Sequence, residues 1–94
     1  MKVHFAKSFI KQSIKCSGTT KKLLDAAILG IENATSIAEI RNCKKLTGYK
    51  NAYRIRIGDY RAIFLFIVID DMVYFQYFLH RGEAYNKEYL KNIE

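Results

Sequence analysis

Apolar residues recur at helical spacing in the first part of the chain and at alternate positions in the second part. Residues 6–15 carry Phe9, Ile10 and Ile14, and Ser17-Gly18 ends this run. Thr19 or Thr20 can cap a second helix that closes at Asn33. The apolar stripe of that second helix consists of Leu23, Leu24, Ala27, Ile28 and Ile31. The pattern predicts a helix hairpin, preceded by a short edge strand over residues 2–5 and followed by one helical turn over residues 36–40.

From Tyr53 onward the apolar period becomes two, and β-branched and aromatic residues dominate. This pattern predicts consecutive strands over residues 53–57, 60–69 and 72–79. Gly58-Asp59 suits a type II′ turn, because glycine tolerates a positive φ at the first central position, and Asp70-Asp71 forms the second predicted turn. Residues 83–93 are mostly polar with a few spaced apolar side chains, which indicates a short final helix or a tail.

Two-residue turns fix which residues face each other across the strands. They place Arg56 opposite Arg61 and Arg61 opposite His80, with Arg54 two residues along the same side. The other side receives an almost unbroken apolar layer: Tyr53, Ile55, Ile57, Tyr60, Ala62, Phe64, Phe66, Val73, Phe75, Tyr77 and Leu79. We therefore expect an α+β fold, in which an N-terminal helix hairpin packs on one face of a small, mainly antiparallel sheet.

Composition limits the class of protein. The 94 residues suffice for a single domain spanning residues 1–94, and an apolar content of 50% excludes a disordered chain. A net charge of +7 favours a polyanion or an acidic protein partner, although a solvated cationic surface is the plain alternative. The longest apolar run, residues 62–69, is too short to span a bilayer, so we expect a cytoplasmic protein without membrane contact.

Motifs for cofactors are missing from the sequence. Cys16 and Cys43 are too few for a disulfide framework, and neither they nor His4 and His80 show metal-ligand spacing. No glycine-rich phosphate loop or serine-based triad is present. We expect no metal and no small-molecule cofactor, and we interpret both thiols as structural.

The predicted row of cations is the main candidate for chemistry. Like charges directly opposite on neighbouring strands destabilise a sheet by roughly 0.2–1 kcal/mol per pair. A bound anion reverses that effect, and phosphate fits the planar donor fork of arginine. The alternatives are that these arginines form a solvated outer surface or that an acidic partner neutralises them.

Three segments together resemble the RelE/ParE toxin superfamily: Lys44-Lys45-Leu46-x-Gly48, then residues 53–61 (YRIRIGDYR), then His80-Arg81 with Tyr85 four residues after Arg81. The resemblance implies a toxin that is silenced by a co-expressed antitoxin. In one branch such toxins cut messenger RNA in the ribosomal A site, and relatives with the same fold poison DNA gyrase. We favour the RNA-cleaving branch.

The resemblance also implies roles for individual residues. Arg54 and Arg56 occupy two basic strand positions, Arg61 and Arg81 two functional arginine positions, and Tyr85 lies near a functional tyrosine. Metal-independent cleavage by the RNA 2′-OH needs a base, an acid and stabilisation of the phosphorane charge. We expect Lys44, Lys45, Arg54 and Arg56 to bind RNA phosphates and Arg61, His80, Arg81 and Tyr85 to be catalytic.

Alternatives stay open for two of these residues and for the activity. His80 can instead bind phosphate or cap the final helix, and Tyr85 can simply pack the tail. The chain can be an mRNA endoribonuclease, a gyrase inhibitor that needs no proton-transfer group, or an inactive homologue kept in an autoregulatory DNA-binding complex. All three share an antitoxin partner, expected to be acidic and partly disordered when free.

Overall fold

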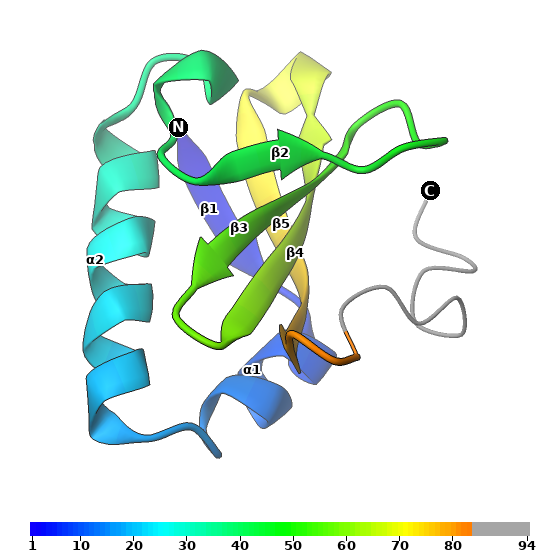
Figure 1. The fold of residues 1–94 in the computed structure, drawn as a ribbon. Helices are drawn as coiled ribbons and strands as arrows, with labels where there is room; N and C mark the ends of the chain where they lie inside the picture. Colours follow the sequence, from blue (N-terminus) through cyan, green and yellow to red (C-terminus); the bar gives the residue numbers. More distant parts are fainter. Residues whose placement is uncertain (84–94) are drawn as a thin grey trace.

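The computed structural model describes residues 1–83, which form two α-helices, two 3-10 turns and five strands (Figure 1). In chain order they are β1 (Lys2–Phe5), α1 (Lys7–Ser13), α2 (Gly18–Asn33), η1 (Ile37–Glu39), β2 (Cys43–Lys45), β3 (Ala52–Ile57), β4 (Tyr60–Ile67), η2 (Val68–Asp70) and β5 (Met72–His80). The final helix or tail expected over residues 83–93 lies outside the described residues, except for Glu83. Within the described part, no helix is both long enough and apolar enough to cross a membrane.

The strands form one sheet in the order β1-β5-β4-β3-β2, in which β1 is parallel to β5 and the other pairs are antiparallel. Side chains of both helices pack on the same side of the sheet, which we call the helix face; the opposite side is the outer face. The helix-face core joins Phe9 of α1 and Leu24 of α2 to Phe64 and Phe75 of the sheet. The predicted α+β architecture, with a helix hairpin on one face of a mainly antiparallel sheet, is confirmed.

The ends of α2 are fixed by specific contacts. The cap is Ser17 and not Thr19 or Thr20, because the Ser17 hydroxyl oxygen accepts a hydrogen bond from the Thr20 N–H at 3.3 Å. Serine is a good N-cap since its oxygen satisfies an otherwise unpaired helix donor. At the other end, the α-amino group of Met1 donates to the carbonyl oxygens of Ile31, Glu32 and Ala34 at 3.0–3.2 Å. The helix is thereby tied to the start of β1.

One of the two predicted turns is correct. Gly58 has φ +59°, and Asp59 is not among the residues with positive φ, as a type II′ turn requires. The second prediction is wrong, because β4 ends at Ile67 and η2 then leads to Asp71, which has φ +49°. The connection is therefore longer than two residues. Its last residue is an aspartate, which tolerates the left-handed conformation better than most residues do.

A β-bulge in β5 changes the predicted face of the residues that follow it. The register shifts between Ile63 and Phe64, which pair with Tyr77 and Phe75, so Gln76 is the extra residue. Adding one residue to a strand moves the later side chains to the opposite face. Phe78 therefore enters the helix-face core, whereas Tyr77 and Leu79, which were expected there, lie on the outer face.

Two side chains of α1 satisfy the backbone of β5 at the bulge. β1 pairs only with Met72–Phe75, so the later part of β5 has no strand on that side. There the Ser8 hydroxyl donates to the Gln76 carbonyl at 2.6 Å, and the Gln12 side-chain oxygen accepts from the Phe78 N–H at 2.8 Å. The helix thus replaces a neighbouring strand at the point where the ladder is irregular.

We expect Gln12→Ala to lower the free energy of unfolding by about 1–3 kcal/mol, because it leaves the Phe78 N–H without its acceptor inside the structure. Urea denaturation measures this difference. Lys11→Ala is the matched control on the same helix: Lys11 is exposed, and its replacement should stay within about 0.5 kcal/mol. Equal effects of the two variants would show that the Gln12 contact contributes nothing to stability.

Candidate functional site

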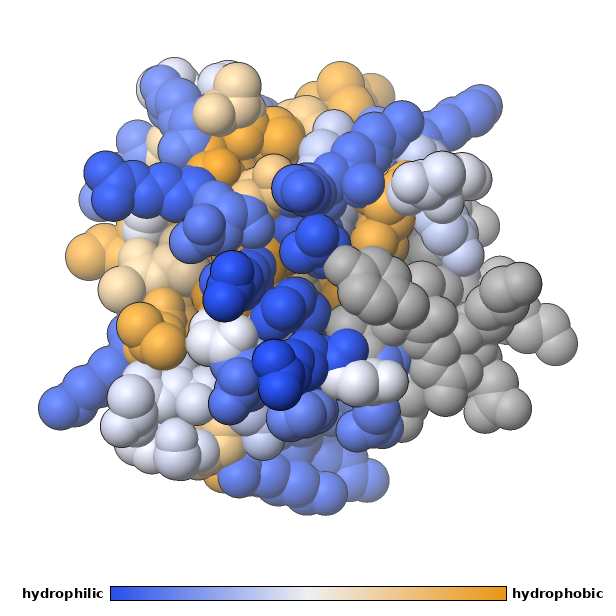
Figure 2. All heavy atoms as spheres, viewed as in Figure 1, coloured by the Kyte–Doolittle hydropathy of each residue, from blue (hydrophilic) through white to orange (hydrophobic). Residues whose placement is uncertain are grey.

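Four cations share the outer face of the sheet because of its register. Lys44 of β2 pairs with Arg54 of β3, and Arg56 of β3 pairs with Arg61 of β4. Directly opposite residues project to the same side with Cβ atoms about 4.5–5.5 Å apart. We call these four residues the cationic cluster. Figure 2 shows strongly hydrophilic side chains in a band across the strands on the side of the molecule that is in view.

The β3–β4 turn positions Arg61. One terminal nitrogen of its guanidinium donates to the carbonyl oxygens of Gly58 at 3.0 Å and Tyr60 at 2.9 Å. The planar guanidinium carries five N–H donors, so this anchoring leaves others available. Arg61 is half-buried, whereas Arg56 opposite it is exposed. A guanidinium anchored by two carbonyl oxygens, with a second, exposed guanidinium opposite it, is suited to binding a phosphate.

His80 does not lie in the row with Arg56 and Arg61, so that geometric prediction is wrong. The bulge places Leu79 opposite Arg61 and places His80 opposite Tyr60, on the helix face. The imidazole meets the Tyr60 ring edge-on, with centroids 5.5 Å apart, and its Nδ1 accepts from the Gly82 N–H at 3.4 Å. Among residues 1–83 the cationic cluster therefore contains no histidine.

Lys45 and Arg81 stand apart from the cationic cluster. Lys45 pairs with Tyr53 and so projects to the helix side of the sheet, which separates it from its expected companion Lys44. Arg81 follows β5, and its backbone N–H donates to the Asp59 carbonyl at 2.8 Å, which holds it beside the β3–β4 turn. Tyr85, the remaining predicted site residue, lies outside the described residues.

An apolar cluster, which we did not predict, lies under the cations. Leu46, Ala52, Ile63 and Leu79 are at most 5% exposed and pack with Tyr49, Leu65 and Tyr77. The outer face is therefore not purely basic. The uninterrupted apolar run of residues 62–69 was the available signal, since a strand with both faces covered is apolar at every position. Ile63 pairs with Arg54 and Leu79 pairs with Arg61, so buried apolar side chains lie directly beside two of the four cations.

Replacing Arg56 by glutamine should stabilise the free protein by about 0.2–1 kcal/mol, because it removes a like-charge pair with Arg61. Thermal and urea denaturation measure this change, and high salt should reduce it by screening. Lys50→Gln is the control, because it removes the same charge from an exposed lysine that lies outside the paired strand positions. If both variants change stability equally, net charge and not the cross-strand pair is responsible.

Cys43, whose strand position pairs with Ile55 of β3, is poorly suited to act as a nucleophile. Both thiols are free, and burial raises the pKa of Cys43 to about 11, partly offset by the charge of Arg54. The thiol is therefore protonated at neutral pH and weakly nucleophilic. Within the described residues, no three His, Cys, Asp or Glu side chains come together in a way that could hold a metal ion.

Comparison with known proteins points to one family, although no family model matches the chain. Toxin RelE3 of Methanocaldococcus jannaschii is 37% identical over 87 residues, which span 92% of this chain and 97% of that toxin. A RelB-RelE antitoxin-toxin complex from Methanococcus jannaschii matches with a TM-score of 0.76 and 32% identity over 88% of this chain and 95% of its counterpart. The archaeal RelE-RelB complex from Pyrococcus horikoshii OT3 has a similar fold, with a TM-score of 0.73 and 24% identity over 88% and 97% of the two chains.

Proposed function

The chain belongs to the RelE family of toxins of toxin–antitoxin systems, and from that premise we propose that it is an endoribonuclease that cuts messenger RNA on the ribosome. The observation that carries the proposal is the Arg56–Arg61 pair on the outer face, with Arg54 and Lys44 beside it. A like-charge pair of this kind lowers the stability of a free sheet, and a bound anion reverses the effect. An RNA phosphate is an anion of the required kind.

In the proposed reaction the 2′-OH attacks the adjacent phosphorus, the bond to the 5′-oxygen breaks, and a 2′,3′-cyclic phosphate forms. Arg61 and Arg56 hold the non-bridging oxygens and stabilise the charge of the phosphorane. Arg54 and Lys44 bind neighbouring phosphates, and Arg81, at the end of β5, stabilises the leaving oxygen. No metal ion takes part in these steps.

Proton transfer needs a group other than guanidinium, which stays protonated in proteins. We assign the base to His80, which accepts the proton of the 2′-OH, while the leaving 5′-oxygen takes its proton from solvent water; Tyr85 stacks on a base or assists. His80 lies at the end of the sheet opposite Tyr60, which precedes Arg61 in the chain. The His80 side chain, however, projects from the helix face. We therefore expect His80 to contribute less to the rate than Arg61 does.

The position of His80 also favours a second candidate, a DNA gyrase inhibitor. Such a toxin needs cationic contacts but no proton-transfer group near them, and within residues 1–83 the cationic cluster has none. This candidate predicts that the toxin arrests growth and induces a DNA-damage response while transcripts stay intact.

Primer extension on translated transcripts after brief induction separates the two candidates. The endoribonuclease produces new 5′ ends within coding regions, and purified protein should produce them only when ribosomes are present. Intact transcripts together with a DNA-damage response would refute RNA cleavage and support the gyrase candidate. Induction of the Arg61→Ala variant, which should fold normally, controls for cleavage by host nucleases.

A further inference from the structure

Two aromatic side chains occupy neighbouring positions on the outer face, where β5 meets β1 (Figure 1). Tyr74 of β5 pairs with His4 of β1 on one side and with Leu65 of β4 on the other. Val73 and Phe75, which flank Tyr74 in the chain, contribute to the helix-face core, so the alternation of the strand places Tyr74 and His4 on the outer face. We call these two residues the aromatic pair.

Nothing in the described part of the protein occupies the aromatic pair. Tyr74 is half-buried and His4 is exposed, and neither side chain makes a hydrogen bond, ion pair or ring contact among residues 1–83. Rings on the helix face are engaged instead: Phe5 stacks on Phe75 with centroids 5.6 Å apart. An unstacked aromatic ring on the face of a sheet is a platform on which a nucleobase can stack.

The sheet register connects the aromatic pair to the cationic cluster. Successive rows across the outer face are Arg56–Arg61, then Lys44–Arg54–Ile63–Tyr77, then Leu65–Tyr74–His4. Rows two residues apart on a strand are separated by about 6.8 Å, so the aromatic pair lies roughly 14 Å along the strands from the Arg56–Arg61 row. The outer face therefore offers cations and aromatic rings in succession, a combination by which proteins bind single-stranded nucleic acid.

The charges near the aromatic pair favour a polyanion and limit its path. Lys2, the next outward-facing residue of β1, is exposed, and no acidic residue precedes Asp25 in the sequence. Beyond Lys2 lie the exposed Asp70 and Asp71, and the Asp71 carbonyl accepts from the Lys2 N–H at 3.2 Å. Carboxylates repel phosphate, so a bound strand should follow the outer face no further than Lys2.

We propose that Tyr74 and His4 form a nucleobase-binding subsite for single-stranded RNA. The subsite takes a base a short distance from the phosphate that Arg56 and Arg61 hold. That base stacks on the Tyr74 ring, and the His4 imidazole extends the platform. Purines are preferred, because they offer the larger surface for stacking. The inference rests on RNA as the ligand of the proposed function, but it does not require that the RNA is cut.

The subsite is tested by the binding of a fluorescein-labelled single-stranded RNA of about 12 nucleotides, measured by anisotropy. The toxin carries Arg61→Ala, which keeps three cations of the cluster. Adding Tyr74→Leu retains an apolar side chain without the ring and should weaken binding at least about fivefold, whereas Tyr74→Phe should stay within about twofold. His4→Ala, at an exposed position, should weaken binding at least about threefold. Met72→Leu, on the same strand and face, is the control and should stay within about twofold.

RNAs that each lack a single base locate the contact. Removing the base that stacks on Tyr74 should weaken binding at least about fivefold in the toxin that has Tyr74, and should have no further effect in Tyr74→Leu. Stacking releases no counterions, so Tyr74→Leu should leave the salt dependence of the affinity unchanged. Arg54→Gln, by contrast, should reduce the slope of log affinity against log salt by about 0.7.

Equal affinities with Tyr74 and with Tyr74→Leu would overturn the proposal, as would binding by Tyr74→Phe as weak as that by Tyr74→Leu. Unchanged affinity of His4→Ala would remove His4 from the subsite, and this variant serves as the test even if Tyr74→Leu fails to fold. The absence of any base whose removal is felt only with Tyr74 present would also refute stacking. If the toxin binds RNA through Tyr74 but leaves transcripts intact, only the proposed nuclease fails; if it cuts RNA and Tyr74→Leu binds normally, only the subsite fails.

Discussion

Replacing Arg61 by alanine is expected to slow RNA cleavage by about 100- to 1000-fold, the effect of losing one well-aimed donor to a developing negative charge. The guanidinium is held by the carbonyl oxygens of Gly58 and Tyr60, so its remaining donors need no reorganisation when the phosphorane forms. Single-turnover cleavage of ribosome-bound messenger RNA measures the rate directly. Binding of RNA should weaken far less, because three other cations of the cluster remain.

Two matched variants sharpen this result. Lys45→Ala removes a cation from the neighbouring region, but on the helix side of the sheet, and should change the rate less than about threefold. His80→Ala should slow cleavage less than Arg61→Ala does, since the imidazole leaves from the face opposite the cationic cluster. A wild-type rate for Arg61→Ala would remove Arg61 from catalysis. A larger loss for His80→Ala would mean that the end of β5 rearranges when RNA binds.

The features that local sequence determines were predictable. Gly58 permits the positive φ of a two-residue turn, and that turn alone brings Arg56 opposite Arg61. Helical spacing likewise predicted the two helices. It did not predict that Ser17 is the N-cap of α2, because the position of the cap depends on where the chain leaves α1. The arginine pair, which carries the proposed function, therefore follows from about six consecutive residues.

The face of His80 was not predictable in the same way, because it depends on a contact between distant parts of the chain. Ser8 and Gln12 bond to the backbone of β5 across separations of 68 and 66 residues. Nothing near Gln76 marks it as the bulged residue. One extra residue then moves Phe78 into the core and Leu79 and His80 onto the faces opposite to those predicted.

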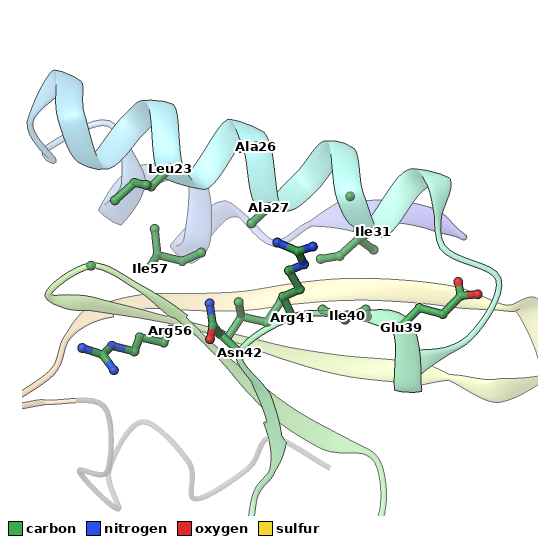
Figure 3. A pocket seen from close by; sticks show the side chains of 13 residues that line it. Leu23, Ala26, Ala27, Ile31, Glu39, Ile40, Arg41, Asn42, Arg56 and Ile57 are labelled. Atoms are coloured by element: carbon green, nitrogen blue, oxygen red, sulfur yellow. The ribbon is translucent and has the colours of Figure 1, made fainter.

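The groove between α2 and β3 (Figure 3) and the apolar cluster of Leu46, Ala52, Ile63 and Leu79 on the outer face illustrate a further limit of pattern analysis. A stripe of Ala26, Ala27 and Gly30 is compatible with a tightly packed helix, and only the structure shows that the space beside Gly30 is open. Similarly, Leu46 and Ala52 flank a loop in the sequence, but the Leu46 N–H donates to the Ala52 carbonyl at 2.8 Å and brings both under the cations. Both features arise from tertiary packing.

The strands that carry the cationic cluster pack on the helix-face core, which contains Phe64. Phe64→Ala is expected to lower the free energy of unfolding by about 3–5 kcal/mol. Phe64 is 0% exposed on the helix face of β4. Its ring stacks on Tyr53 with centroids 5.4 Å apart and meets Phe75 edge-on at 5.7 Å. Domains of this size are stable by about 5–15 kcal/mol, so the loss is a large fraction of the total.

Phe5→Ala provides the control for this prediction. Phe5 also stacks on Phe75, at 5.6 Å, but lies on the edge strand β1 and is 38% exposed, so its removal creates no closed cavity. We expect a loss below about 1.5 kcal/mol, measured by urea denaturation with the same dependence on denaturant. Comparable losses in the two variants would show that burial of Phe64 in the helix-face core does not dominate the stability of the protein. The strands that align Arg56 with Arg61 would then be held mainly by their backbone hydrogen bonds.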